Sequence, residues 1–209
     1  MLKKERNHDM KKNSAQKVVF VAVLGTIAYL LMLLRFPLPF MPPFMDFDLS
    51  GIPEMIGTFL LGPSSGIFIA LLKNLLKLAT TGSSSMFTGE AMNFLLSVSY
   101  LLPAWLFYRK QKTKKDAIIG MIIGTFVATV VACLANIYVI LPFYGELYNL
   151  PMDEIVAMTE SVNPYVNSVS RLVVIGIAPF NLIKNGVTTI LIALSLDRLK
   201  KIFKRRVKS

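Results

Sequence analysis

Several apolar runs of this sequence approach the roughly 20 residues that an α-helix needs to cross a lipid bilayer. The composition agrees, because 54% of the 209 residues are hydrophobic and 17% are charged. An average soluble domain has about 25% charged residues. We therefore expect an all-α integral membrane protein, folded as a single membrane domain over residues 1–209, and we exclude an ordinary secreted or cytosolic enzyme.

The apolar runs and the breaks between them predict six transmembrane helices. We expect these at about residues 18–35, 52–61, 63–80, 90–108, 116–141 and 169–197, between a tail over 1–17 and a basic tail over 198–209. The stretch 52–80 is ambiguous, because Gly62-Pro63 can stop one helix and start another. As a hairpin, its first helix would be only about 15 Å long, so neighbouring helices would have to shelter it from lipid.

The distribution of lysine and arginine favours the hairpin. Of the 23 basic residues, 18 lie before the first helix, within 109–115, or within 198–208, whereas the loops 36–50 and 142–168 carry acidic residues and no basic ones. Basic segments flanking membrane helices stay in the cytoplasm. Six helices with both termini cytoplasmic put all three basic segments on that side. We therefore expect the basic residues behind the net charge of +11 to interact with anionic lipid headgroups rather than with nucleic acid.

The sequence lacks the residues that several classes of protein need for their function. Cys133 is the only cysteine and His8 the only histidine, so we expect no disulfide, no metal cluster and no histidine-based catalysis. The sequence has no glycine-rich phosphate loop and no catalytic constellation. We therefore expect no enzyme, no ATP hydrolysis by this chain and no resident cofactor.

A cluster of polar residues in the last apolar run predicts a binding site. Asn181, Lys184 and Asn185 stand at i, i+3 and i+4 and share one helix face, and Asn136 lies near the outer end of the preceding run. Hydrogen bonding between helices is the structural alternative. Because amides and an amine occur without a carboxylate in the same helix, we expect a neutral ligand that has carbonyl acceptors and N–H donors.

Two further lysines fall inside apolar segments, where an uncompensated charge costs about 2.5 kcal/mol or more. Lys73 either pairs with a carboxylate, such as Glu54 or Glu90, or lines the ligand cavity. Lys77 lies near the external end of its helix, and we expect it to snorkel toward water. The external loop 142–168 can form a partial lid with a short helix over 152–159.

Several short motifs occur in an order that resembles the substrate-binding S components of energy-coupling factor (ECF) transporters, and most closely their riboflavin-binding member. These motifs are Asp46-Phe47 with Ile52-Pro53, Gly62-Pro63 with Gly66, Lys73-Asn74-Leu75-Leu76, Gly89-Glu90 with Asn93-Phe94, and Pro179-Phe180-Asn181 with Lys184. The resemblance implies an S-component fold in a bacterial cell membrane. It also implies uptake of riboflavin as a transported ligand, together with a transmembrane coupling subunit and two ATPase subunits. FMN stays open as a second ligand.

The resemblance also assigns roles to individual residues. Asn136, Asn181 and Lys184 correspond to polar ligand contacts, while Met45 and Phe47 correspond to a cover over the flavin ring. The coupling surface of such proteins often carries Ala-x-x-x-Ala on the first helix. Here the matching positions are Ala22 and Thr26, so threonine replaces the second alanine at the expected partner contact.

Two alternatives remain open at this point. One is an S component for another vitamin. The other is a stand-alone secondary transporter, which would need a buried carboxylate as a proton or cation site, and for which Glu54 and Glu90 are the candidates.

Overall fold

The computed structural model describes residues 2–83, 85–149 and 151–207. Side chains 1–14 and 203–209 lie outside the described residues, and with them many of the basic groups predicted to meet lipid. The first part of the chain forms the helices α1 (Leu2–Leu33), α2 (Gly51–Leu61), α3 (Pro63–Thr81), α4 (Thr88–Tyr108) and α5 (Lys114–Ala135). A short antiparallel pair, β1 (Phe36–Pro37) and β2 (Asp46–Phe47), lies between α1 and α2.

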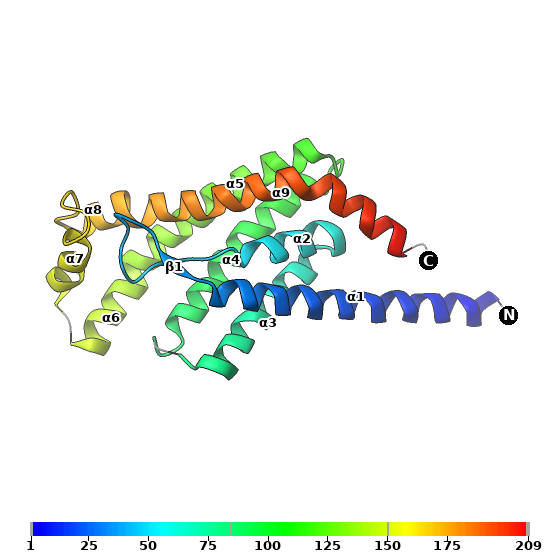
Figure 1. Cartoon of the computed structure of the whole chain (residues 1–209), viewed down its shortest axis with the longest axis horizontal. Coiled ribbons are helices and arrows are strands. Elements are labelled where there is room, and N and C mark those ends of the chain that lie inside the picture. Colours follow the sequence, from blue (N-terminus) through cyan, green and yellow to red (C-terminus); the bar gives the residue numbers. More distant parts are fainter. Residues whose placement is uncertain (1, 84, 150, 208–209) are drawn as a thin grey trace.

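The second part of the chain contains two π-helical turns within long helices. The turn η1 (Asn136–Ile140) joins α5 to α6 (Leu141–Tyr148), and η2 (Leu172–Ile177) joins α8 (Val169–Arg171) to α9 (Ala178–Val207). A short helix, α7 (Met152–Glu160), lies between them where the sequence predicts one. In Figure 1 the start of α1 and the end of α9 lie at one end of the molecule, and α6, α7 and α8 lie at the other.

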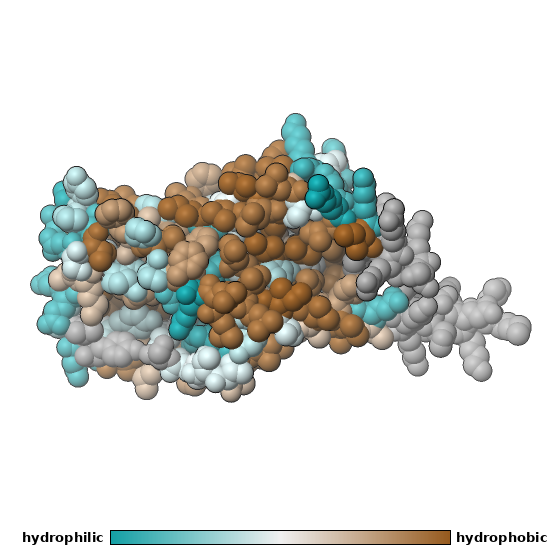
Figure 2. Space-filling view, viewed as in Figure 1, coloured by the Kyte–Doolittle hydropathy of each residue, from teal (hydrophilic) through white to brown (hydrophobic). Residues whose placement is uncertain are grey.

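Four of the described helical segments are long and apolar enough to cross a membrane. They are Ala15–Leu33, Thr88–Tyr108, Lys114–Leu147 and Val169–Ile202. α2 is a shorter apolar helix, and α3, which carries Lys73 and Lys77, is not among the four. Figure 2 shows hydrophobic residues across the middle of one face and hydrophilic residues beside α7 and toward the opposite end. This distribution suits a protein embedded in a bilayer.

The structure differs from the sequence prediction in three places. The first helix begins at Leu2 rather than near residue 18, so the helix continues through the basic tail. The helix predicted to end at 141 continues to Tyr148, because Pro142 falls in the first turn of α6, where its missing N–H is tolerated. The all-α prediction also lacked the pair of β1 and β2, which is two residues long in each strand.

The chain reverses between α2 and α3 at Gly62, as the hairpin interpretation requires. Gly62 has a φ of 102°, which side chains rarely permit, and Pro63 follows as the first residue of α3. Beyond the turn, α3 approaches α2 so closely that a Cβ on Gly66 would lie 1.8 Å from Oγ1 of Thr58. The two helices therefore pack closely against each other.

The buried core lies where α2, α4, α5 and α9 meet. Met55, Leu101, Met121 and Ile192 belong to this cluster and are fully buried. A second cluster packs α7 against η2 and α6 near the other end of the molecule. Between the two clusters the helices enclose a cavity.

Candidate functional site

The cavity is lined by the loop before α2 and by residues of α2, α3, α4, η1, α6 and α9. Its volume is about 200 Å³, and both apolar and polar side chains line it. Five of the six residues predicted to bind a ligand line this cavity, namely Met45, Asn136, Asn181, Lys184 and Asn185. Sequence positions more than 100 residues apart therefore meet at one site.

Phe47 is the exception. It is buried outside the cavity, and its ring lies 5.4 Å from the ring of Phe36, its partner in the β1–β2 pair. Neighbouring residues of an extended strand point to opposite sides, and here Asp46 lines the cavity. Phe47 therefore packs within the loop, whereas Met45 and Phe44 line the cavity, and the expectation that Phe47 covers the ligand stays a prediction.

Asn136 and Asn181 are oriented in the same way. Each side-chain amide donates a hydrogen bond to the backbone carbonyl four residues earlier, Asn136 to Ala132 at 2.8 Å and Asn181 to Ile177 at 2.9 Å. Both side chains are buried. Among the described residues the two Oδ1 atoms have no hydrogen-bond partner, so each asparagine has an acceptor left for a ligand.

The two π-helical turns explain why these asparagines face the cavity. Pro142 follows η1 and Pro179 follows η2 by two residues. Proline has no N–H for the carbonyl four residues earlier, and π-turns accommodate such interruptions and occur often at functional sites. Each wide turn changes the register of its helix close to an asparagine that lines the cavity, Asn136 or Asn181.

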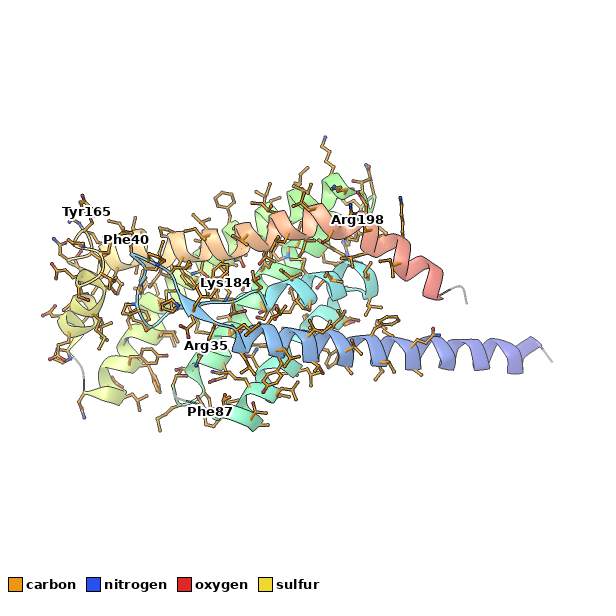
Figure 3. The ribbon with its side chains drawn as sticks, in the orientation of Figure 1. Arg35, Phe40, Phe87, Tyr165, Lys184 and Arg198 are labelled. Atoms are coloured by element: carbon orange, nitrogen blue, oxygen red, sulfur yellow. The ribbon has the colours of Figure 1, made fainter. Side chains whose placement is uncertain are left out.

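Lys184 is paired with a carboxylate that the sequence analysis did not connect to it. Its Nζ lies 2.7 Å from Oδ2 of Asp48 in the loop before α2. Oδ1 of Asp48 accepts the backbone N–H of Ser50 at 2.8 Å. Figure 3 shows Lys184 below α9, toward the chain that enters α2. The available sequence signal was weak, because it consisted of an acidic residue three positions before a short apolar helix.

Lys73 continues this polar network, and both alternatives for it hold. Its Nζ donates to Oγ of Ser50 at 2.6 Å and lies 2.5 Å from Oε1 of Glu54. The side chains of Lys73 and Glu54 are 2% and 1% exposed, respectively. Lys73 thus pairs with a predicted carboxylate and also lines the cavity.

The charges around Asp48 determine its ionisation. Burial acts to raise the pKa of this carboxyl group, whereas the neighbouring ammonium groups of Lys184 and Lys73 act to lower it. Hydrogen bonds from Lys184 and Ser50 act in the same direction, so the pKa of Asp48 falls well below its usual range. Asp48 is therefore a carboxylate at neutral pH.

Tyr100 of α4 forms part of the cavity wall next to α9. Its hydroxyl lies 2.9 Å from Oγ1 of Thr189 and donates to the backbone carbonyl of Asn185 at 3.4 Å. These contacts connect α4 to the helix that carries Lys184. The sequence analysis did not identify Tyr100, because a tyrosine in an apolar run looks like a packing residue.

A second cavity of about 540 Å³ shares five lining residues with the first. Ile155 and Met158 of α7 line it, so the predicted short helix lies at this second cavity. Lys77 lines it too, but its ammonium pairs with Glu90 of α4 instead of snorkelling to water. Glu90 also accepts a hydrogen bond from Ser83 at 2.8 Å.

The predicted partner contacts lie away from both cavities. Ala22 and Thr26 are exposed on α1, and Oγ1 of Thr26 donates to the carbonyl of Ala22 at 2.9 Å. The opposite face of α1 packs on α3, where a Cβ on Gly25 would meet Leu72. The face of α1 that carries Ala22 and Thr26 is therefore exposed in this chain.

Comparisons with known proteins agree with this geometry. A profile of the family "ECF transporter, substrate-specific component" matches residues 16–196. The riboflavin transporter RibU of Staphylococcus aureus is 35% identical over 200 residues, which are 96% of this chain and 97% of that protein. The riboflavin transporter FmnP of Bacillus subtilis is 32% identical over 186 residues, covering 88% and 92% of the two chains.

A solved structure is similar as well. It is described as "Structure and mechanism of the S component of a bacterial ECF transporter" and is 34% identical to this chain. The alignment has a TM-score of 0.72 and covers 91% of this chain and 99% of that one. The similarity thus extends over most of the chain.

Proposed function

The chain belongs to the substrate-specific components of ECF transporters, and from that membership we propose that it binds riboflavin and mediates its uptake across a bacterial cell membrane. Two relatives that align with most of the chain are named riboflavin transporters. The observation that carries the proposal is the cavity in which Asn136, Asn181 and Lys184 meet.

The chemistry of the cavity suits a flavin. The isoalloxazine ring is flat and apolar, and one edge alternates carbonyl acceptors with an N–H donor. The unpartnered Oδ1 atoms of Asn136 and Asn181 suit the N–H donor, and Lys184 can donate to a carbonyl or a ribityl oxygen. Apolar walls with a few fixed polar groups are the usual form of such a site. Met45 and Asn185 would complete the contacts.

The direction of transport follows from the topology that we propose. Six membrane helices, with α2 and α3 as a sheltered hairpin, put both termini in the cytoplasm. Support comes from the shared end of α1 and α9 in Figure 1 and from the acidic loop on the opposite side. The cavity then lies toward the outside, beneath α7 and the loop before α2.

Energy for uptake comes from partner subunits in this proposal. A transmembrane coupling subunit and two ATPase subunits complete the transporter, and Ala22 and Thr26 on the exposed face of α1 contact the coupling subunit. Small residues allow two membrane helices to approach closely. Riboflavin is the transported ligand rather than a cofactor, and FMN is a second ligand to test.

The secondary-transporter alternative is weaker in the light of the ion pairs. Its two candidate carboxylates, Glu54 and Glu90, pair with Lys73 and Lys77, respectively. Both carboxylates are therefore already engaged in ion pairs, so neither is free to hold a transported cation.

One experiment tests the proposal directly. The chain is purified in detergent without added ligand, its visible absorption is recorded and any bound chromophore is identified by mass. We expect a stoichiometric flavin, or quenching of added riboflavin fluorescence on binding. A colourless protein that leaves riboflavin fluorescence unchanged contradicts the riboflavin assignment and directs the search to other vitamins.

A further inference from the structure

The cations around the two cavities are balanced by carboxylates. Among the described lining residues the positively charged groups are Lys73, Lys184, Lys77 and Arg35, and their partners are Glu54, Asp48, Glu90 and Asp46, respectively. The site thus offers hydrogen-bond donors without a net charge. A ligand that enters the site therefore meets polar groups but no excess of positive or negative charge.

Two of the described lysines line the first cavity, and Lys184 is the more exposed of them, since Lys73 is 2% exposed. Lys184 lines the first cavity and is 20% exposed, while its partner Asp48 is 5% exposed and lines the second cavity. An ammonium group has three N–H donors, and among the described residues Lys184 uses one of them, toward Asp48. The remaining donors are available to a ligand, although the charge of Lys184 is already compensated.

Asp48 is held in place independently of Lys184. The backbone N–H of Ser50 binds its other oxygen, and Ser50 in turn accepts a hydrogen bond from the buried Lys73. The carboxylate therefore does not depend on the ligand for its position. Because charges interact strongly where water is excluded, a fixed negative charge here weakens the attraction of any anion to Lys184.

We infer that Asp48 is a specificity-determining residue, which acts through Lys184 to make the cavity prefer an uncharged flavin over an anionic one. This inference rests on the proposed function. Without Asp48, the site carries an unpaired positive charge and gains affinity for anions relative to neutral ligands. Without Lys184, it carries an unpaired negative charge and shifts in the opposite sense.

Riboflavin and FMN form the matched pair of probes, because they differ by one phosphate group. The two Kd values are measured by fluorescence quenching at about pH 8, where the phosphate is fully ionised. We expect Asp48→Asn to move the ratio of the two affinities about tenfold toward FMN. Lys184→Met should move it by a similar factor toward riboflavin, and the double variant should return it close to the wild-type ratio.

An ion pair far from the cavity supplies the control. Lys114 and Asp197 lie 3.5 Å apart with side chains 43% and 57% exposed. Asp197→Asn removes the same charge as Asp48→Asn but is expected to change the ratio by less than about twofold, because water and salt screen the exposed pair.

The outcomes are distinguishable. Equal shifts in one direction for Asp48→Asn and Lys184→Met, or flavin binding with an unchanged ratio, overturn the inference but leave the proposed function intact. If Asp48→Asn binds neither flavin, the double variant decides: recovered riboflavin binding supports the inference and continued loss overturns it. A wild-type chain that binds neither flavin overturns the proposed function and this inference with it.

Discussion

The ammonium nitrogen of Lys184 lies 2.7 Å from Oδ2 of Asp48, which precedes it by 136 positions in the chain. Through Ser50 the same carboxylate is connected to Lys73 and Glu54. One polar network therefore joins α9, the loop before α2, and the α2–α3 hairpin at the cavity. Binding and folding depend on the same contacts there, so their effects have to be separated by experiment.

Removing only one partner of the Lys184–Asp48 ion pair should destabilise the folded protein. Lys184→Met leaves the carboxylate of Asp48 buried without its main partner, and we expect the free energy of unfolding to fall by about 3 kcal/mol. Unfolding in detergent without flavin measures this. The double variant, with Asp48→Asn added, should recover most of the loss, because no buried charge remains unpaired. Losses that simply add in the double variant contradict the pairing.

The lowered pKa of Asp48 makes the stability of the folded protein depend on pH. Since the folded-state pKa lies below its ordinary value of 3.8, the unfolded chain takes up a proton first as the pH falls. The contribution of Asp48 is therefore complete above about pH 5 and is lost as the pH drops toward the folded-state pKa. The stability difference between wild type and Asp48→Asn should stay constant from about pH 8 to 5 and shrink below about pH 4. A decline that begins near neutral pH contradicts the lowered pKa.

Asn181→Ala tests a ligand contact. It removes the acceptor next to the cavity, and we expect riboflavin affinity to fall about tenfold while the protein stays folded. Thr125→Ala is the matched control, because the buried Thr125 also donates to the carbonyl four residues earlier, that of Met121, but lines neither cavity. Unchanged affinity in Asn181→Ala would assign that residue a purely structural role.

Much of this site was predictable from helix geometry. The spacing of Asn181, Lys184 and Asn185 puts them on one face, and the structure has all three at the cavity. Asn136 was predictable because polar residues in apolar runs face the interior of a bundle. These inferences needed only local periodicity.

The unpredicted features depend on long-range packing. The partner of Lys184 comes from a loop far away in sequence, and periodicity does not show which lysine a given carboxylate meets. The position of Phe47 outside the cavity was not predictable, because a strand of two residues leaves too little alternation of side chains to be recognised in the sequence. The early start of the first helix at Leu2 was missed because its tail is charged rather than apolar.

The close crossing of α4 and α5 should limit side-chain size at Gly124. A Cβ there would lie 2.4 Å from the backbone carbonyl oxygen of Tyr100, which cannot move without shifting α4 and the cavity wall. We expect Gly124→Ala to cost about 1–3 kcal/mol of stability and to weaken flavin binding. Gly186→Ala is the control, since nothing lies within 4 Å of its added Cβ and alanine favours a helix. Equal stability of both variants in thermal unfolding contradicts the tight crossing.

The exposed face of α1 should matter for uptake but not for binding. Thr26→Trp adds a large side chain to the face that we assign to the coupling subunit, and Thr26 lines neither cavity. Because a close approach of helices depends on small residues, we expect riboflavin affinity of the purified chain to change by less than about twofold while ATP-dependent uptake in cells falls at least about tenfold. Val130→Trp, at an exposed position of α5, is the control for a bulky residue facing lipid. Uptake lost equally in both variants points to a general effect on membrane insertion, and uptake retained in Thr26→Trp moves the coupling surface to another face.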